Sequence, residues 1–147
     1  MNNRLRRQAG VTLIEMMVVV TIIALFAALV LPKMMHQADR AKVVAAHADI
    51  NGFTTALGAY KLDTGNFPTT EQGLQALVKQ PADPTITNYP AGGYLKQIPK
   101  DPWGNPYLYT SPGADGREYD IISYGRDGKP GGEGPDADIA SYSLDQK

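Results

Sequence analysis

An apolar run near the amino terminus constrains this chain more than any other feature. Residues Val11 to Leu31 read VTLIEMMVVVTIIALFAALVL, with Glu15 as the only charged side chain, and Pro32 and Lys33 follow. At 1.5 Å per residue, a helix of this length is about 31 Å long, close to the roughly 30 Å thickness of a bilayer's hydrocarbon core. The run therefore predicts a single membrane-spanning helix.

The segment before the run sets the expected orientation. It reads MNNRLRRQAG, with three arginines and no acid. Because basic residues stay on the cytoplasmic side, residues 1–10 are expected in the cytoplasm and everything after Pro32 on the other side of the membrane.

Two other interpretations of the apolar run fit less well. A cleaved secretory signal needs two small residues around its cleavage site, and Ala27-Ala28-Leu29 is a poor match. A buried core helix with apolar residues on every face needs a large protein around it, and this chain has only 147 residues.

Glu15 is the unusual residue of the run. A carboxylate inside hydrocarbon costs about 2.5–3.5 kcal/mol on insertion scales, so it needs a partner or a proton. Cleavage after Gly10 would leave the ammonium group of Val11 four residues before Glu15, where it could neutralise Glu15 in the same helix or in a neighbouring subunit. The alternative is that Glu15 lies close enough to the end of the span to reach the lipid headgroups.

These residues carry a resemblance to a known signal. The segment Gly10-Val11-Thr12-Leu13-Ile14-Glu15 resembles the G-[FM]-T-L-x-E class III signal of type IV pilins and pseudopilins. The resemblance implies that a membrane prepilin peptidase cleaves between Gly10 and Val11, that the new amino group of Val11 is methylated, and that Glu15 guides subunit assembly. Val11 departs from the pattern, which usually has Phe at this position.

A second helical pattern follows Pro32. Its apolar residues recur three or four positions apart, as expected for a half-buried helix. They are Val43, Ala46, Ile50, Phe53, Leu57 and Tyr60, and the opposite positions carry Arg40, Lys42, His47, Asp49 and Lys61. We expect one long helix over residues 11–62, capped near Gly65, with a kink or local melting at Pro32.

The remainder of the chain predicts a small sheet. Thr69 and Gln72 have the spacing of a capping box and predict a short second helix that ends before Pro81. Residues 80–106 contain six prolines, which leaves little room for regular structure, although Trp103 and Tyr107 are expected to anchor this segment. Residues 107–110 and 119–123 are predicted to form strands joined by a turn.

The chain has no cysteine, which excludes disulfides, thiolate zinc sites and cysteine nucleophiles. Its formal net charge is −1, from 14 Lys+Arg and 15 Asp+Glu, so nucleic acid is not an expected partner. His36 and His47 would be about 16 Å apart on a continuous helix, too far to share a metal. With no P-loop, GxGxxG or HExxH motif, the chain is not expected to be an enzyme.

An acidic, glycine-rich segment lies near the carboxyl terminus. Residues 124–139 read YGRDGKPGGEGPDADI, which supplies the oxygen donors that calcium prefers but lacks the spacing of an EF-hand. The composition alone also fits a solvated turn.

The resemblance extends over the chain from Gly10 to Ile139. Residues 60–77, 93–95 and 101–107 are similar to segments typical of the major pseudopilin family of type II secretion systems. This implies an α+β fold, with a long amino-terminal helix packed on a small antiparallel sheet and a calcium-binding carboxyl-terminal loop. The implied calcium ligands are the side chains of Asp127, Asp136 and Asp138 and, in addition, the Tyr124 backbone carbonyl, while the role of Glu133 stays open.

The same resemblance implies an organisation and a function. Residues 1–10 form a cleaved leader, residues 11–32 a transmembrane and filament-core helix, and residues 33–147 a periplasmic globular domain. The expected protein is a bacterial inner-membrane subunit that forms a helical homopolymer, the periplasmic pseudopilus that supports export of folded proteins. Its expected partners are the prepilin peptidase, minor pseudopilins and the inner-membrane assembly platform. The alternatives are a type IV pilin-like surface fibre and a membrane-anchored binding module that never polymerises.

Overall fold

The computed structural model of the chain describes residues 10–143, and for residues 31–36 it describes the backbone alone. Its contacts divide the chain into two compact units, Met1–Ala38 and Asp39–Lys147. The arginines of the expected leader and the side chain of His36 lie outside the described residues.

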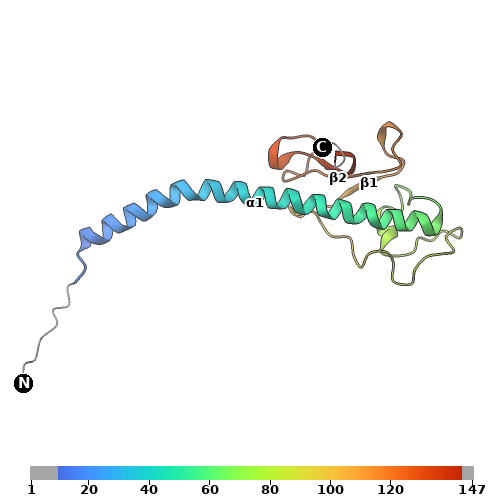
Figure 1. The fold of residues 1–147 in the computed structure, drawn as a ribbon, viewed down its shortest axis with the longest axis horizontal. Helices are drawn as coiled ribbons and strands as arrows, with labels where there is room; N and C mark the ends of the chain where they lie inside the picture. The colour runs from blue at the N-terminus through green and yellow to red at the C-terminus, as the bar shows by residue number, and fades with distance from the viewer. Residues whose placement is uncertain (1–9, 144–147) are drawn as a thin grey trace, which may run out of the picture. The chain divides into compact units, whose positions relative to one another are not determined.

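One helix, α1, spans Leu13–Thr64 and belongs to both units (Figure 1). It continues through Pro32, so the local melting considered there is not observed; a proline removes only one backbone hydrogen bond, and its neighbours keep theirs. The helix ends at Thr64 and is capped as expected by Gly65, which adopts a φ of 85° and donates its N–H to the Lys61 carbonyl at 2.8 Å.

The second unit packs around the apolar stripe of α1, which is buried as predicted. Figure 1 shows β1 and β2 alongside this part of the helix. The ring of Phe53 lies edge-on to that of Tyr107, with centroids 5.0 Å apart. Asp49 differs from its expected place on the exposed face: it is half-buried because its carboxylate accepts a 2.8 Å hydrogen bond from the Tyr107 hydroxyl. The buried members of the stripe are Ala46, Ile50, Phe53, Leu57 and Tyr60.

The predicted second helix is only partly correct. The capping box is present, with the Thr69 N–H donating to Gln72 Oε1 at 2.9 Å and the Gln72 N–H to Thr69 Oγ1 at 3.2 Å. The chain then forms turns and a short 3₁₀-helix over Leu74–Leu77 instead of an α-helix. The reason is Gly73, whose φ of 59° is incompatible with a continuous right-handed helix.

The sheet has three antiparallel strands in the order β1-β2-β3. Strands β1 (Leu108–Thr110) and β2 (Asp120–Ser123) confirm the two predicted strands to within a residue at their starts. Strand β3 (Ile139–Ala140) was not predicted, because two residues are too few to show an alternating pattern. Three further 3₁₀ turns lie at Ala114–Gly116, Gly134–Asp136 and Ser141–Ser143. The acidic segment is therefore the connection between the neighbouring strands β2 and β3.

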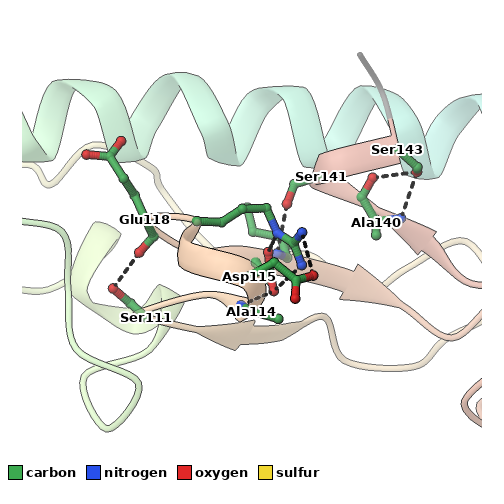
Figure 2. A network of polar contacts seen from close by, with 10 residues as sticks. Ser111, Ala114, Asp115, Glu118, Ala140, Ser141 and Ser143 are labelled. Carbon is green, nitrogen blue, oxygen red and sulfur yellow. Dashed lines mark hydrogen bonds and ion pairs between the residues drawn. The ribbon is translucent and has the colours of Figure 1, made fainter. Parts of the chain in front are cut away.

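A polar network holds the β1–β2 connection and the segment that follows β3 (Figure 2). The Arg117 guanidinium donates to both carboxylate oxygens of Asp120, at 2.6 and 3.2 Å, and the Ala114 N–H donates to the same carboxylate at 2.8 Å. Arg117 also lies over the ring of Tyr142, 4.1 Å from its centroid. The Ser141 hydroxyl accepts from the Ile121 N–H at 3.0 Å, which fixes the segment after β3 to β2.

Two leucines of α1 give a direct test of the core. Leu57 is fully buried and Leu62 is 88% exposed. We expect Leu57→Ala to lower the free energy of unfolding by about 2–5 kcal/mol, because it leaves a cavity, and Leu62→Ala to change it little. Urea unfolding of the detergent-solubilised chain, followed by the fluorescence of the single tryptophan, measures both. Equal effects of the two substitutions would contradict this core.

The Arg117–Asp120 pair predicts a dependence of stability on pH. The hydrogen bond from Arg117 holds the pKa of the buried Asp120 carboxyl below its ordinary value. Asp120 therefore stabilises the fold above the unfolded pKa of about 3.9, and this contribution is lost as the pH falls through the lower folded pKa. We expect Asp120→Asn to destabilise the chain at pH 7 and to flatten the acid limb of its stability profile. Asp115→Asn, at an 86% exposed side chain that also pairs with Arg117, should leave the profile close to that of the wild type.

Candidate functional site

The first candidate site is the apolar part of α1. In the described part of the chain, one helical segment, Leu13–Val30, is long and apolar enough to cross a membrane, with a mean hydropathy of 2.8. None of its residues is buried, and large side chains such as Leu25 and Phe26 are more than 60% exposed. The hydroxyl of Thr21 donates to the Met17 carbonyl at 2.7 Å, so it is satisfied within the helix. Such a surface is stable only when lipid or other apolar helices cover it.

The start of α1 is a reciprocal capping box formed by Thr12 and Glu15. The Glu15 N–H donates to Thr12 Oγ1 at 3.3 Å, and the Thr12 N–H approaches Glu15 Oε2 at 3.5 Å. Gly10 and Val11 precede the helix, are exposed and have no regular secondary structure. The peptide bond between Gly10 and Val11 therefore lies in accessible, non-helical backbone, which is the form of chain that a peptidase can bind.

The second candidate site is the β2–β3 connection, residues 124–138, here called the acidic loop. A buried carboxylate, Asp101, holds its beginning: the Ser123 hydroxyl donates to Asp101 Oδ2 at 2.7 Å and the Asn105 N–H to Asp101 Oδ1 at 2.7 Å. The Asn105 side-chain amide then donates to the Gly125 carbonyl at 3.0 Å. The proline-rich segment before β1 thus supports the entry to the acidic loop.

The acidic loop closes on itself through its backbone. The Arg126 N–H donates to the Pro135 carbonyl at 3.0 Å. A Cβ on Gly125 would lie 2.9 Å from the carbonyl oxygens of both Pro135 and Ala137, and a Cβ on Gly132 would lie 2.3 Å from the Asp136 carbonyl oxygen. Both glycines also have positive φ, 64° and 87°. Backbone carbonyl oxygens therefore crowd together in this loop at positions that only glycine permits.

The three carboxylates that the sequence predicts as calcium ligands are held separately. Asp127 Oδ1 accepts from the Lys129 N–H at 3.1 Å, and Asp138 Oδ2 accepts from the Gly131 N–H at 3.0 Å. Asp136 accepts two hydrogen bonds from the guanidinium of Arg126, from Nε at 2.8 Å and from Nη2 at 2.9 Å. Among the side chains that the structure describes, those of residues 10–30 and 37–143, no three of His, Cys, Asp or Glu are grouped to hold a metal ion.

Tyr124 and Glu133 take different places in the acidic loop. Tyr124 directly follows β2 and is half-buried. Glu133 is exposed, and its backbone carbonyl accepts from the Asp136 N–H at 3.2 Å at the start of the 3₁₀ turn.

Arg126 is the residue that the sequence analysis missed. Besides its two hydrogen bonds to Asp136, its Nη1 lies 3.8 Å from Asp39 Oδ2 on α1. The pKa of Asp136 is lowered and that of Arg126 is raised, chiefly by the hydrogen bonds between them. The position of Arg126 next to Asp127 in the sequence was a signal for an ion pair, but the sequence did not show its partners, which lie ten or more positions away.

The chemistry of the acidic loop fits a hard cation. Its donors are carboxylates and crowded backbone carbonyls, which are the ligands that calcium takes, and its glycines allow the backbone to turn around an ion. The difference from a formed calcium site is the position of Asp136, whose two oxygens already face a guanidinium.

Comparison with known proteins decides the family. A family model described as type II secretion system (T2SS), protein G matches residues 33–142, and one described as prokaryotic N-terminal methylation motif matches residues 5–31. The chain belongs to the type II secretion system protein G family. The resemblance stated from the sequence is thereby confirmed, and the pilin-like fibre is not favoured.

Relatives named type II secretion system core protein G match most of the chain. The type II secretion system core protein G of Pseudomonas aeruginosa is 52% identical over 125 residues, which cover 84% of this chain and 87% of the relative. That of Vibrio cholerae is 46% identical over 126 residues, 86% of each chain. The crystal structure of the major pseudopilin from the type 2 secretion system of enterohaemorrhagic Escherichia coli matches with a TM-score of 0.65 at 38% identity, over 77% of this chain and 96% of that one.

Proposed function

We propose that this member of the protein G family is a structural subunit that polymerises into the periplasmic pseudopilus of a type II secretion system, supporting export of folded proteins across the outer membrane. The observation that carries the proposal is the Leu13–Val30 helix, wholly unburied in a chain whose second unit has its own complete core. A subunit of this kind needs lipid before assembly and other copies of the same helix after it. Contacts between copies that do not close into a ring produce a filament.

Processing at the amino terminus prepares the subunit for assembly. The exposed, non-helical bond between Gly10 and Val11 suits cleavage by the prepilin peptidase, and the match to the methylation motif supports methylation of the Val11 amino group. The new amino group would then lie beside the Thr12–Glu15 capping box. We propose that Glu15 sets the register between subunits, because the amino group of Val11 in a neighbouring subunit neutralises its charge.

The location follows from the same helix. We place residues 11–32 in the bacterial inner membrane, with the uncleaved leader in the cytoplasm and the globular domain, residues 33–147, in the periplasm. The inner-membrane assembly platform would transfer the helix from lipid into the filament, where minor pseudopilins join the homopolymer. The family is one of structural subunits, and the proposed role requires no catalysis by this chain.

We further propose a structural calcium ion in the acidic loop. Asp127, Asp136 and Asp138 would hold it with their carboxylates, and Tyr124 with its backbone carbonyl. A divalent cation would neutralise carboxylates that otherwise repel one another and would fix a loop that has few apolar side chains of its own. In a chain without cysteine, the ion would hold the loop in place as a disulfide does in a pilin.

Filament assembly tests the role of Glu15. Glu15→Gln removes the charge at nearly constant size, so we expect it to be inserted into the membrane and cleaved after Gly10 but not to form filaments. Glu71→Gln, at an exposed carboxylate of the globular unit, is the matched control and should assemble as the wild type does. Electron microscopy of sheared filaments and mass spectrometry of the membrane fraction provide the two measurements. Normal filaments from Glu15→Gln, or wild-type filaments whose subunits keep residues 1–10, would contradict the proposal.

Calcium removal tests the proposed ion. A ligand present at 100 times its Kd and bound only to the folded chain stabilises it by about 2.7 kcal/mol, so adding calcium to chelator-treated protein should raise its Tm. Asp127→Ala and Asp138→Ala should each abolish this increase, whereas Asp115→Ala, in the β1–β2 turn, should keep it. A Tm that does not depend on calcium in the wild type would rule out the ion.

A further inference from the structure

The guanidinium of Arg126 lies among the carboxylates of the acidic loop and of α1. It donates two hydrogen bonds to Asp136, at 2.8 and 2.9 Å, and lies 3.8 Å from Asp39. Asp127 is its direct neighbour in the chain. A cation of the protein itself, the Arg126 guanidinium, therefore already binds one of the carboxylates proposed to hold the calcium ion.

Both carboxylate oxygens of Asp136 are engaged by this pair. Two parallel N–H···O bonds from Arg are the strongest form of contact between a guanidinium and a carboxylate. A calcium ion binds its ligand oxygens at about 2.3–2.6 Å, and a guanidinium held against the same carboxylate repels a divalent cation that approaches it. The same Asp136 oxygens cannot serve the guanidinium and the ion equally well at one time.

Arg126 has a second partner close by. Its side chain is 52% exposed, so it can move, and Asp39 on α1 is already within ion-pair distance. The backbone of Arg126 is held independently, because its N–H donates to the Pro135 carbonyl at 3.0 Å. The guanidinium can therefore leave Asp136 for Asp39 without opening the acidic loop.

We infer that Arg126 is an internal cation that closes the acidic loop when calcium is absent and competes with calcium for Asp136. Calcium binding transfers the guanidinium from Asp136 to Asp39. The ion then closes the acidic loop, and the ion pair between Arg126 and Asp39 attaches the start of the loop more firmly to α1. Arg126 thus sets the calcium concentration at which the loop becomes occupied. This inference rests on the proposed calcium site.

The test is calcium titration of the detergent-solubilised, chelator-treated full-length chain by isothermal titration calorimetry, with the Tm in the absence of calcium as a second readout. The variants are Arg126→Ala and Lys129→Ala, which each remove one positive charge from the acidic loop. Of these two residues, Arg126 is the one whose side chain donates hydrogen bonds to the Asp136 carboxylate. We expect Arg126→Ala to bind calcium between about two- and fivefold more tightly than Lys129→Ala, and to have a lower Tm without calcium.

Asp39→Asn provides an independent measurement, because it removes the second partner of the guanidinium. It should weaken calcium binding up to about twofold relative to the wild type while leaving Asp136 and the other proposed ligands intact. Arg126→Ala combined with Asp39→Asn should bind calcium as Arg126→Ala alone does, since no guanidinium is left to move.

The outcomes separate this inference from the calcium proposal. Calcium binding that is equal in Arg126→Ala and Lys129→Ala would overturn the competition and leave the calcium site standing. Weaker binding by Arg126→Ala would show that the guanidinium supports the ion, which also overturns the inference. Absence of calcium binding by the wild type and by all variants would overturn both.

Discussion

The apolar half of α1 presents to its surroundings side chains that water solvates poorly, and the described chain contains nothing that covers them. Burying one large aliphatic side chain is worth about 1.5–3 kcal/mol, so a segment such as Leu13–Val30 is driven strongly into lipid or against other helices. The globular unit packs on a later part of α1, residues 43–60, and buries only the apolar stripe there. The drive on Leu13–Val30 makes association with a membrane or with further copies a physical requirement of the chain.

The globular unit depends on α1 in a different way. Its three short strands supply few backbone ladder bonds, so side chains complete the hydrogen bonding of the connections. Asp101 orders the entry to the acidic loop, and Arg117 and Asp120 order the β1–β2 turn. Each of these carboxylates is buried and fully engaged, which fits the high cost of burying an unpaired charge. The apolar stripe of α1 then gives these connections one common surface to pack on.

One carboxylate of the acidic loop is neutralised by a residue of the same loop. In this structure Arg126 neutralises Asp136, and the crowded backbone around Gly125 and Gly132 sets the shape within which the pair forms. The proposed calcium ion and the guanidinium have the same electrostatic effect: each reduces the repulsion between neighbouring carboxylates. They differ in geometry, because a calcium ion coordinates several oxygens from all directions whereas the N–H donors of a guanidinium lie in one plane.

Features that depend on neighbours a few positions apart could be predicted from the sequence: the membrane-length run, the buried stripe of α1, the stop at Gly65, the Thr69–Gln72 capping box, and the first two strands. The motif at Gly10–Glu15 indicated a pilin or pseudopilin, and residues 60–77, 93–95 and 101–107 indicated the major pseudopilin family, because each of these patterns is also local. The tertiary structure was needed to show that Gly73 turns the second helix into a 3₁₀ turn and that β3 exists. It also decided that Asp136 pairs with Arg126 and that Asp39 stands within reach. These features depend on groups brought together across many residues by the packing of the sheet and its loops on α1, and no short-range pattern records such distances.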